Sequence, residues 1–403
     1  MNPELRFKDQ DGNAFPDWEE KKIKEIGRVT MCKRIFKDQT LAWGEIPFFK
    51  IGTFGDIPDA YITRELFEDF KKKYPYPQKG NILISASGSI GKLVEYNGED
   101  AYFQDSNIIW LEHKNDVLDK YLKQIYSTLN WEEGLEGSTI KRLYNKVFLN
   151  KVIFLPQVLE QSKIAALLSD IDKKIESQAT LVEKLKNTKD AMLVKMFPQG
   201  ESKVPEIRFD GFSGDWEVKK LGSVADIFDG VHQTPNYMSY GVMFLSVEDI
   251  STLKSNKYIS QEDFEKNFRV FPQKGDVLMT RIGDVGTPKV VETKDFIAYY
   301  VSLALIKPKC IDSYFLNYSI LSNHFKKGLL ERTLVTAIPK KINKNEIGKV
   351  NILLPEDKIE QEKIGQFFSN LDKKIEINQQ KYEKLCDVKK ALLSKLFPTK
   401  EDE

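Results

Sequence analysis

The chain has 403 residues, and 61 Lys and Arg nearly balance 60 Asp and Glu, which gives a formal net charge of +1. This length accommodates roughly two to four domains. With 30% charged and 41% hydrophobic residues, the composition excludes a disordered chain, and no apolar run is long enough to span a bilayer. A small autonomous DNA-binding protein is usually more basic, so any nucleic-acid surface must be a local patch, or partner chains must supply further positive charge.

The first residues and the cysteines indicate a cellular compartment. The N-terminal sequence MNPELRFKDQDG contains no apolar signal for export. Cys32, Cys310 and Cys386 lie far apart and lack CxxC spacing, so they are most simply reduced thiols. We therefore expect a cytoplasmic protein that does not contact a membrane.

The opening segment of the chain occurs twice. The matching pieces are residues 4–7 (ELRF), 18–19 (WE) and 21–23 (KKI), and then residues 206–209 (EIRF), 216–217 (WE) and 219–221 (KKL). Internal similarity of this kind is typical of a repeat architecture. We interpret the protein as two versions of one module, each of which begins with this segment.

A mixed domain is predicted after each opening segment. In the first domain, branched and aromatic residues indicate strands at 46–51 and 92–96, a turn followed by a buried strand at 79–85, and a helix at 121–129. The second domain has the corresponding elements at 242–247, 274–280, 288–293 and 314–327. The fold class is therefore α+β in both domains. Between these elements the two domains diverge, as two domains that recognise different targets would, or as simple drift after duplication would.

A long helix closes each module. The sequences of residues 155–198 and 354–398 align almost throughout, and prolines bound each copy near its start and at its end. An apolar 4-3 pattern between the prolines keeps one seam of the helix facing a partner helix. The seam residues are Ile164, Leu168, Ile171, Ile175, Val182, Leu185, Met192 and Met196, and then Ile364, Phe368, Leu371, Ile375, Tyr382, Leu385, Leu392 and Leu396.

Polar residues interrupt the two seams at matching positions, namely Gln178 and Lys189, and then Asn378 and Lys389. A polar residue in a helical seam costs stability but can fix the register of two helices. The helices either pack on their own domains or pair with each other. We favour an antiparallel coiled coil of the two copies, because a long apolar stripe needs a long partner.

No catalytic set is found in the sequence. Residues 85–93 (SASGSIGKL) lack the spacing and the final hydroxyl of a phosphate loop. Residues 234–237 (TPNY) differ from the Asn/Asp-Pro-Pro-Tyr/Phe element of amino-methyltransferases, and Asp17 and Glu19 are too close for a two-strand metal site. His113, His232 and His324 are scattered and lack metal-ligand spacing. We therefore expect neither a catalytic residue nor a metal site in this chain.

The whole pattern resembles a known family. Two divergent domains alternate with two similar helices, which begin with Pro156 followed by EQSKI (160–164) and with Pro355 followed by EQEKI (360–364). This arrangement resembles the specificity subunit of type I restriction–modification systems, and the resemblance covers essentially the whole chain. It divides the sequence into a first target recognition domain (1–153), a first spacer helix (154–199), a second target recognition domain (200–352) and a second spacer helix with a tail (353–403).

The resemblance implies a function and a set of partners. Each domain would read one half of a split sequence in double-stranded DNA, and the paired helices would separate the domains and dock two modification subunits. Those subunits would carry S-adenosylmethionine and methylate adenine, and restriction subunits would use ATP and Mg to translocate and cleave DNA in host defence. This chain would bind no cofactor itself. The alternative is a scaffold whose domains bind protein instead of DNA.

Candidate DNA contacts come from basic and polar residues in loops and glycine turns. Arg reads guanine with two hydrogen bonds, and Gln or Asn reads adenine in the same way. We expect Arg281 to be the best candidate, because it precedes a glycine turn and its counterpart is the uncharged Ala86. The candidates are Lys33, Arg34, Ser87, Ser89, Lys92, Thr139, Lys141 and Arg142 in the first domain, and His232, Gln233, Arg281, Asp284, Lys340 and Lys341 in the second.

Overall fold

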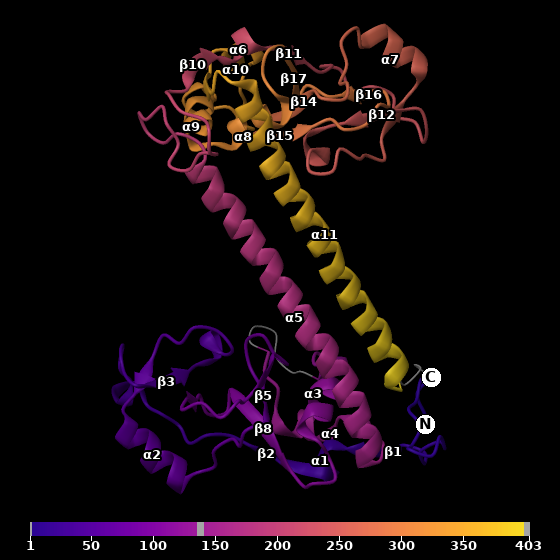
Figure 1. Ribbon diagram of the computed structural model, residues 1–403. Helices are drawn as coiled ribbons and strands as arrows, with labels where there is room; N and C mark the ends of the chain where they lie inside the picture. Colours follow the sequence, from indigo (N-terminus) through magenta and orange to yellow (C-terminus); the bar gives the residue numbers. More distant parts are fainter. Residues whose placement is uncertain (1, 135–140, 399–403) are drawn as a thin grey trace. The chain divides into compact units, whose positions relative to one another are not determined.

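The computed structural model describes residues 2–134 and 141–398, which form two compact units (Figure 1). The first unit comprises Met1–Gln178 and Lys381–Glu403, and the second comprises Ala179–Gln380. Each unit therefore contains one of the two related domains together with a part of each long helix.

Three sheets form the strand framework of the first unit. They have the orders β2-β8-β5-β6, β4-β3-β7 and β1-β9, and all neighbours are antiparallel except β3 and β7. The strands are β1 (Glu19–Lys22), β2 (Gly27–Thr30), β3 (Ile46–Phe49), β4 (Tyr61–Ile62), β5 (Ile82–Ser85), β6 (Leu93–Glu95), β7 (Tyr102–Phe103), β8 (Ile108–His113) and β9 (Val152–Leu155). The short helices are α1 (Ile23–Ile26), η1 (Lys37–Gln39), η2 (Ile51–Thr53), α2 (Arg64–Lys73), α3 (Asp119–Thr128) and α4 (Asn145–Asn150).

The second unit repeats this topology. Its sheets have the orders β11-β17-β14-β15, β13-β12-β16 and β10-β18, and β12 and β16 form the parallel pair. The strands are β10 (Glu217–Lys220), β11 (Ala225–Asp229), β12 (Val242–Leu245), β13 (Tyr258–Ile259), β14 (Val277–Ile282), β15 (Asp284–Val290), β16 (Ile297–Tyr299), β17 (Leu303–Pro308) and β18 (Asn351–Leu354). The short helices are α6 (Leu221–Val224), η3 (Val247–Asp249), α7 (Gln261–Asn267), α8 (Ser313–Leu321), α9 (Asn323–Arg332) and α10 (Lys344–Gly348).

The four-stranded sheet of each unit lies between two hydrophobic cores. In β5, Ile82 and Ile84 belong to one core and Leu83 to the other, as the alternation of side chains along a strand requires. In β14, Val277 and Leu278 divide in the same way. In Figure 1, α3 and α4 lie on the long-helix side of the first unit, whereas α2 and β3 lie on the other side. One core of each unit therefore includes residues of the long helices, and the other core lies on the opposite face of the sheet.

The long helices are α5 (Val158–Lys195) and α11 (Lys358–Leu396), and both are continuous. The Phe-Pro sequence that ends each helix is part of a domain core. Phe397, after α11, lies 6.3 Å from Trp18 between ring centroids in the first unit. Phe197, after α5, lies 5.9 Å from Trp216 in the second unit. Each helix therefore begins in one unit and ends in the other.

Each unit pairs the start of one long helix with the end of the other, so the helices are antiparallel. The predicted seam residues of both helices are buried or half-buried. Lys389 of α11 lies 2.5 Å from Asp172 of α5 in the first unit, and Lys189 of α5 lies 2.6 Å from Asp372 of α11 in the second. The predicted α+β fold with two related domains and two antiparallel helices is confirmed, and the seam lysines are held by aspartates of the opposite helix.

Some predicted elements differ from those in the structure. The helix expected at 314–327 is two helices, α8 and α9, because Ser322 has an extended backbone and its side chain caps α9 by accepting from the Phe325 N–H. The long helices begin at Val158 and Lys358 because β9 and β18 occupy the residues just before them. Within the described part of the chain, no helix has the length and apolar character needed to cross a membrane.

Candidate nucleic-acid interface

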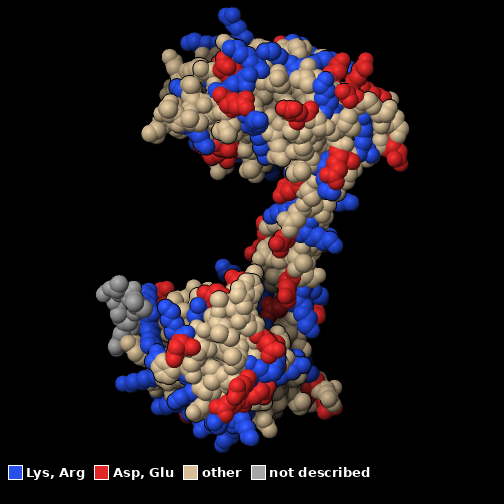
Figure 2. All heavy atoms as spheres, turned by 90° about the vertical axis from the view of Figure 1, so that its left-hand side faces the viewer, with Lys and Arg blue, Asp and Glu red and all other residues tan. Residues whose placement is uncertain are grey.

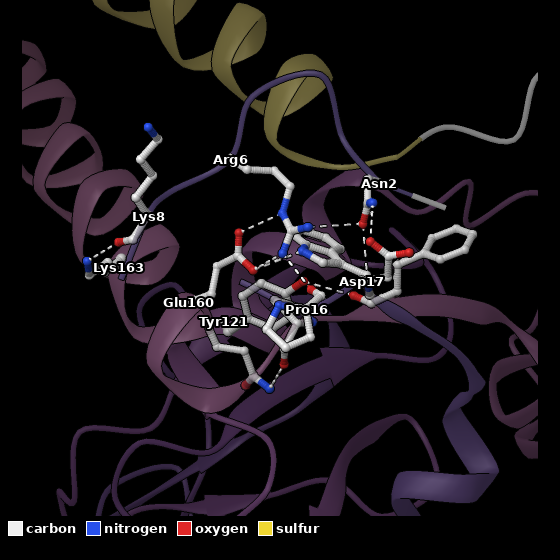
Figure 3. A network of polar contacts seen from close by, with 12 residues as sticks. Asn2, Arg6, Lys8, Pro16, Asp17, Tyr121, Glu160 and Lys163 are labelled. Carbon is white, nitrogen blue, oxygen red and sulfur yellow. Dashed lines mark hydrogen bonds and ion pairs between the residues drawn. The ribbon is translucent and has the colours of Figure 1, made fainter. Parts of the chain in front are cut away.

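The opening segment of the first unit is fixed to α5 by one buried carboxylate (Figure 3). Glu160, which is 0% exposed, accepts two hydrogen bonds from Arg6, at 3.1 and 2.7 Å, and one from Trp18 Nε1 at 3.1 Å. Arg6 also donates to the carbonyl of Pro16 at 2.7 Å. The hydrogen bond to Glu160 raises the pKa of Arg6. The carboxylate thus joins two ends of the opening segment to the helix.

The second unit repeats this arrangement with one difference. Arg208 donates to both oxygens of Glu360, at 2.7 and 2.8 Å, but Trp216 Nε1 has no hydrogen-bond partner among the described residues. The glutamine that follows each glutamate accepts a backbone N–H at the start of the domain helix, from Leu118 in one unit and Asp312 in the other. The repeated Glu-Gln pair therefore positions each domain on its helix.

Three candidate stretches of the first unit meet at one loop, residues 105–107. Arg34 Nε lies 3.2 Å from Asp105 Oδ2. Arg142 donates to the carbonyl of Ser106 at 3.2 Å. Ser87 Oγ donates to Asn107 Oδ1 at 2.9 Å. The structure therefore brings together residues that are far apart in the sequence.

The other candidates of the first domain lie around this loop to different degrees. Lys33 is exposed, with its ammonium 5.3 Å from the centre of the Tyr74 ring. Ser89 and Lys92 belong to the glycine turn, in which the Lys92 N–H donates to Ser85 Oγ at 2.8 Å. Lys141 is exposed and lies 3.7 Å from Glu132. Thr139 lies outside the described residues.

The corresponding loop of the second unit, residues 300–302, also contacts two of the candidate stretches. The Val301 N–H donates to Val231 O at 3.0 Å, next to the candidates His232 and Gln233, which are both exposed. The Arg281 N–H donates to Ser302 O at 2.9 Å, as the Ala86 N–H donates to Asn107 O at 2.7 Å in the first unit.

In both units, the glycine turn after β5 or β14 also meets a loop that lies late in the domain, which we call the late loop. The late loop includes Arg142 in the first unit and Lys340 and Lys341 in the second. Ser87 pairs with Arg142 in an antiparallel bridge, and Ile282 pairs with Lys341 in the same way. The Gly283 N–H donates to Lys340 O at 2.8 Å. Two divergent domains thus present the same set of loops around one point, although the side chains there differ.

The prediction for Arg281 is corrected by its burial. Arg281 is 5% exposed overall, its Nη1 pairs with Asp229, and its Nε donates to Ile342 O at 3.1 Å. Burial lowers the pKa of this guanidinium. Arg281 is therefore no candidate for a DNA contact, because it links β11, the turn and the late loop to one another inside the unit. Asp284 is exposed, but its carboxylate accepts from the hydroxyls of Thr280 and Thr287, at 3.2 and 2.6 Å.

The sequence interpretation missed the loops 105–107 and 300–302, since neither has a distinctive composition. It also missed an exposed aromatic residue at matching positions. Trp43 is 85% exposed and Tyr240 72%, and each precedes a glycine beside the start of β3 or β12. The sequences LAWG (41–44) and MSYG (238–241) contained that signal, because an aromatic-glycine pair recurs before the same strand.

The surface charge agrees with the near-zero net charge. Figure 2 shows Lys and Arg interspersed with Asp and Glu on the face of each unit that it presents. Among the described residues, no group of His, Cys, Asp and Glu could hold a metal ion. The candidate residues of each unit therefore lie on a surface of mixed charge and not on a strongly basic one.

The sequence comparisons give the class of protein. The family model of the type I restriction modification DNA specificity domain matches residues 16–187 and 213–386, so it matches both repeats. The chain therefore belongs to this family.

Two relatives differ in how much of the chain they cover. A putative type I restriction enzyme specificity subunit of Haemophilus influenzae is 51% identical, but the match covers 37% of this chain and 38% of that protein. The MjaVIII type I restriction enzyme specificity subunit of Methanocaldococcus jannaschii is 26% identical over 98% of this chain and 96% of its own.

Solved structures share the fold. The crystal structure of a type I restriction–modification S subunit from M. genitalium aligns over 100% of both chains with a TM-score of 0.69 at 16% identity. A match at this level of identity concerns the architecture alone. It agrees with the two-domain, two-helix organisation described above.

Proposed function

We propose that this chain is the DNA-recognition subunit of a type I restriction–modification complex, and that each unit reads one half of a bipartite target in double-stranded DNA. The observation that carries the proposal is the repeated loop cluster. Both units have a glycine turn, a late loop and a third loop (105–107 or 300–302) at the same point of the same framework, but with different side chains. Two such loop clusters are suited to the recognition of two different short DNA sequences.

The long helices supply the second part of the proposal. A helix of 38 residues is roughly 57 Å long at 1.5 Å per residue, whereas half-sites read from one side of B-DNA lie about 34–36 Å apart per turn. We propose that the helix pair sets the unread spacer and docks two modification subunits. Restriction subunits would complete the complex. S-adenosylmethionine, ATP and Mg would be bound by those partners, and this chain would contribute recognition without a catalytic group.

Reconstitution with a modification subunit tests the proposal. The purified complex, supplied with S-adenosylmethionine, should methylate adenines within one bipartite motif, which sequencing of the methylated DNA would identify. The chain alone should show no methylation, nuclease or ATPase turnover. Turnover by the chain alone, or methylation without a bipartite motif, would overturn the proposal.

Binding measurements separate this function from a protein-binding scaffold. For a complex that neutralises DNA phosphates, the logarithm of the affinity falls linearly with the logarithm of the salt concentration. The complex should show this dependence and should prefer its methylation motif to a scrambled duplex. A complex that assembles but binds no duplex would favour the scaffold.

A further inference from the structure

The late loop of the second unit, residues 334–341, is fastened at its base to the candidate interface. The Leu334 N–H donates to Lys341 O at 2.8 Å and closes the loop. The Gly283 N–H donates to Lys340 O at 2.8 Å, and Lys341 pairs with Ile282 in an antiparallel bridge. These bonds hold the base against the turn between β14 and β15, so the tip projects from a defined position.

The tip of this loop is apolar and uncovered. Ile338 is 100% exposed and Val335 63% exposed, and Leu334 at the base of the loop is 45% exposed. A single exposed apolar side chain is ordinary on a protein surface, whereas several of them close together can mark a binding site. Because Ile338 is fully exposed, the folded chain gains no burial from it. A partner that covers it would gain the transfer of this side chain from water.

The charge around the tip indicates which partner covers it. Lys340 and Lys341 follow Ile338 after one proline, both are exposed, and neither makes a salt bridge within the described part of the chain. Lysines neutralise phosphates, while apolar side chains contact the thymine methyl or enter between base steps. An apolar tip next to two unpaired cations therefore matches duplex DNA, whose phosphates flank its bases.

We propose that Ile338 enters a groove of the DNA and is buried against bases of the half-site read by the second unit, while Lys340 and Lys341 bind the adjacent phosphates. The inference rests on the proposed function and adds to it a specificity residue outside hydrogen-bond readout. In the first unit, the corresponding stretch around Thr139 lies outside the described residues. The proposal therefore concerns the second unit alone.

The test uses the complex of the full chain with its modification subunits and the motif found by methylation sequencing. Ile338→Ala should weaken binding to the motif about tenfold, the effect of losing most of a buried aliphatic contact. Its affinity for a scrambled duplex should not change. Lys340→Ala and Lys341→Ala should weaken binding to both duplexes, and each should reduce the salt slope by about 0.9. Ile338→Val should keep most of the affinity.

Val218→Ala is the matched control, because Val218 is 47% exposed on β10 of the same unit, a strand that carries none of the candidate contacts. It should bind the motif as the wild type does. Unchanged motif binding by Ile338→Ala, with the wild-type preference intact, would overturn this inference and leave the proposed function standing. Loss of assembly with the modification subunits would also overturn it, since Ile338 would then contact protein. If the wild-type complex had no sequence preference, the proposed function itself would fail and this inference with it.

Discussion

The two units have the same framework, but several of the side chains that it carries differ. In both, an arginine of the opening segment binds a buried glutamate of the long helix, and a phenylalanine after the other long helix packs on a tryptophan. The aspartate that forms the ion pair with the seam lysine has a different second donor in each unit. Asp172 also accepts from Gln124 at 3.0 Å, whereas Asp372 accepts from the hydroxyl of Tyr318 at 2.7 Å. The geometry of this site is retained although the donor has changed.

The difference is larger at the candidate interface. The second unit has the buried ion pair of Arg281 and Asp229. By strand register, the same two positions in the first unit are Ala86 and Met31, and both belong to or pack on its hydrophobic core. One domain therefore supports its turn with a salt bridge and the other with apolar packing. The turn is therefore present in both units although the contacts that support it differ.

Exchange of one domain should have the largest effect on recognition. We expect that replacing residues from Lys33 to Lys151 with the equivalent region of a relative changes one half of the methylated motif completely. The half read by residues from Val224 to Val350 should persist, because the two loop clusters belong to different units. Methylation sequencing of the chimera checks this. A change in both halves would mean that the units do not read independently.

A matched insertion in both long helices should change the spacer. Asp172 and Lys189 are as far apart along α5 as Asp372 and Lys389 are along α11, so lengthening one helix alone would disturb an ion pair. A heptad inserted after Gln178 and another after Gln380 keep both seams in phase. Each adds about 10 Å at 1.5 Å per residue, or roughly three base pairs at 3.4 Å per step.

The two half-sequences should survive this insertion while the spacer in the methylation motif lengthens. The added base pairs also rotate one half-site about the DNA axis, so the rate of methylation is expected to fall. An insertion of five residues in each helix is the control, because it turns the apolar seam away and should lower stability instead. A folded, active heptad variant that retains the original spacer would show that the helices do not set it.

The sequence predicted the framework better than the interface, for a physical reason. The seam of α5 and α11 and the buried strands follow local periodicity, which side-chain burial imposes directly. The role of Arg281 depends on Asp229, which lies on another strand and far away in the sequence. An arginine before a glycine turn has the same local pattern whether it faces a nucleic acid or an internal carboxylate. The convergence on loops 105–107 and 300–302 is equally non-local, so no local signal could have predicted it.

Removal of the buried glutamate should cost the most stability among single substitutions. Glu360→Ala leaves Arg208, which is largely buried, without its carboxylate, and we expect a loss of about 3 kcal/mol from the second unit. Chemical denaturation of the variant and the wild type, monitored by hydrogen exchange in the second unit, measures this loss. Glu362→Ala, at an exposed position of the same helix, should change stability little. Equal effects of the two substitutions would mean that the clamp at Glu360 does not stabilise the unit.

The ion pair of the second unit allows a direct conversion toward the first. Arg281→Ala alone leaves the partly buried Asp229 with Lys344, at 3.9 Å, as its one remaining salt-bridge partner among the described residues, and should destabilise the second unit by about 2–3 kcal/mol. The double variant Asp229→Met with Arg281→Ala reproduces the residues of the first unit. It should recover most of that loss, because an apolar pair needs no charge partner. Denaturation of the three proteins compares them, and a double variant less stable than the single one would contradict the proposed equivalence.

The smallest expected effect is an opposite pH dependence of the two units. A hydrogen bond to Asp119, 3.2 Å from Nε2, raises the pKa of His113 above its ordinary value of 6.5, whereas burial, reinforced by Lys327, lowers the pKa of His324. The stabilisation from His113 is therefore complete below pH 6.5 and is lost as the pH rises through the raised folded pKa. The stability linked to His324 is complete above pH 6.5 and falls as the pH drops toward the lowered folded pKa.

Hydrogen exchange can follow each unit separately between about pH 5.5 and pH 8, the range in which histidine titrates. On acidification, the first unit should gain stability relative to the second. His113→Gln should abolish the gain in the first unit alone, and His324→Gln should abolish the loss in the second unit alone, so each variant is the control for the other. Both changes should be smaller than the effect of Glu360→Ala, since neither histidine is fully buried. A parallel pH dependence in both units, unaffected by either substitution, would show that other groups dominate the titration.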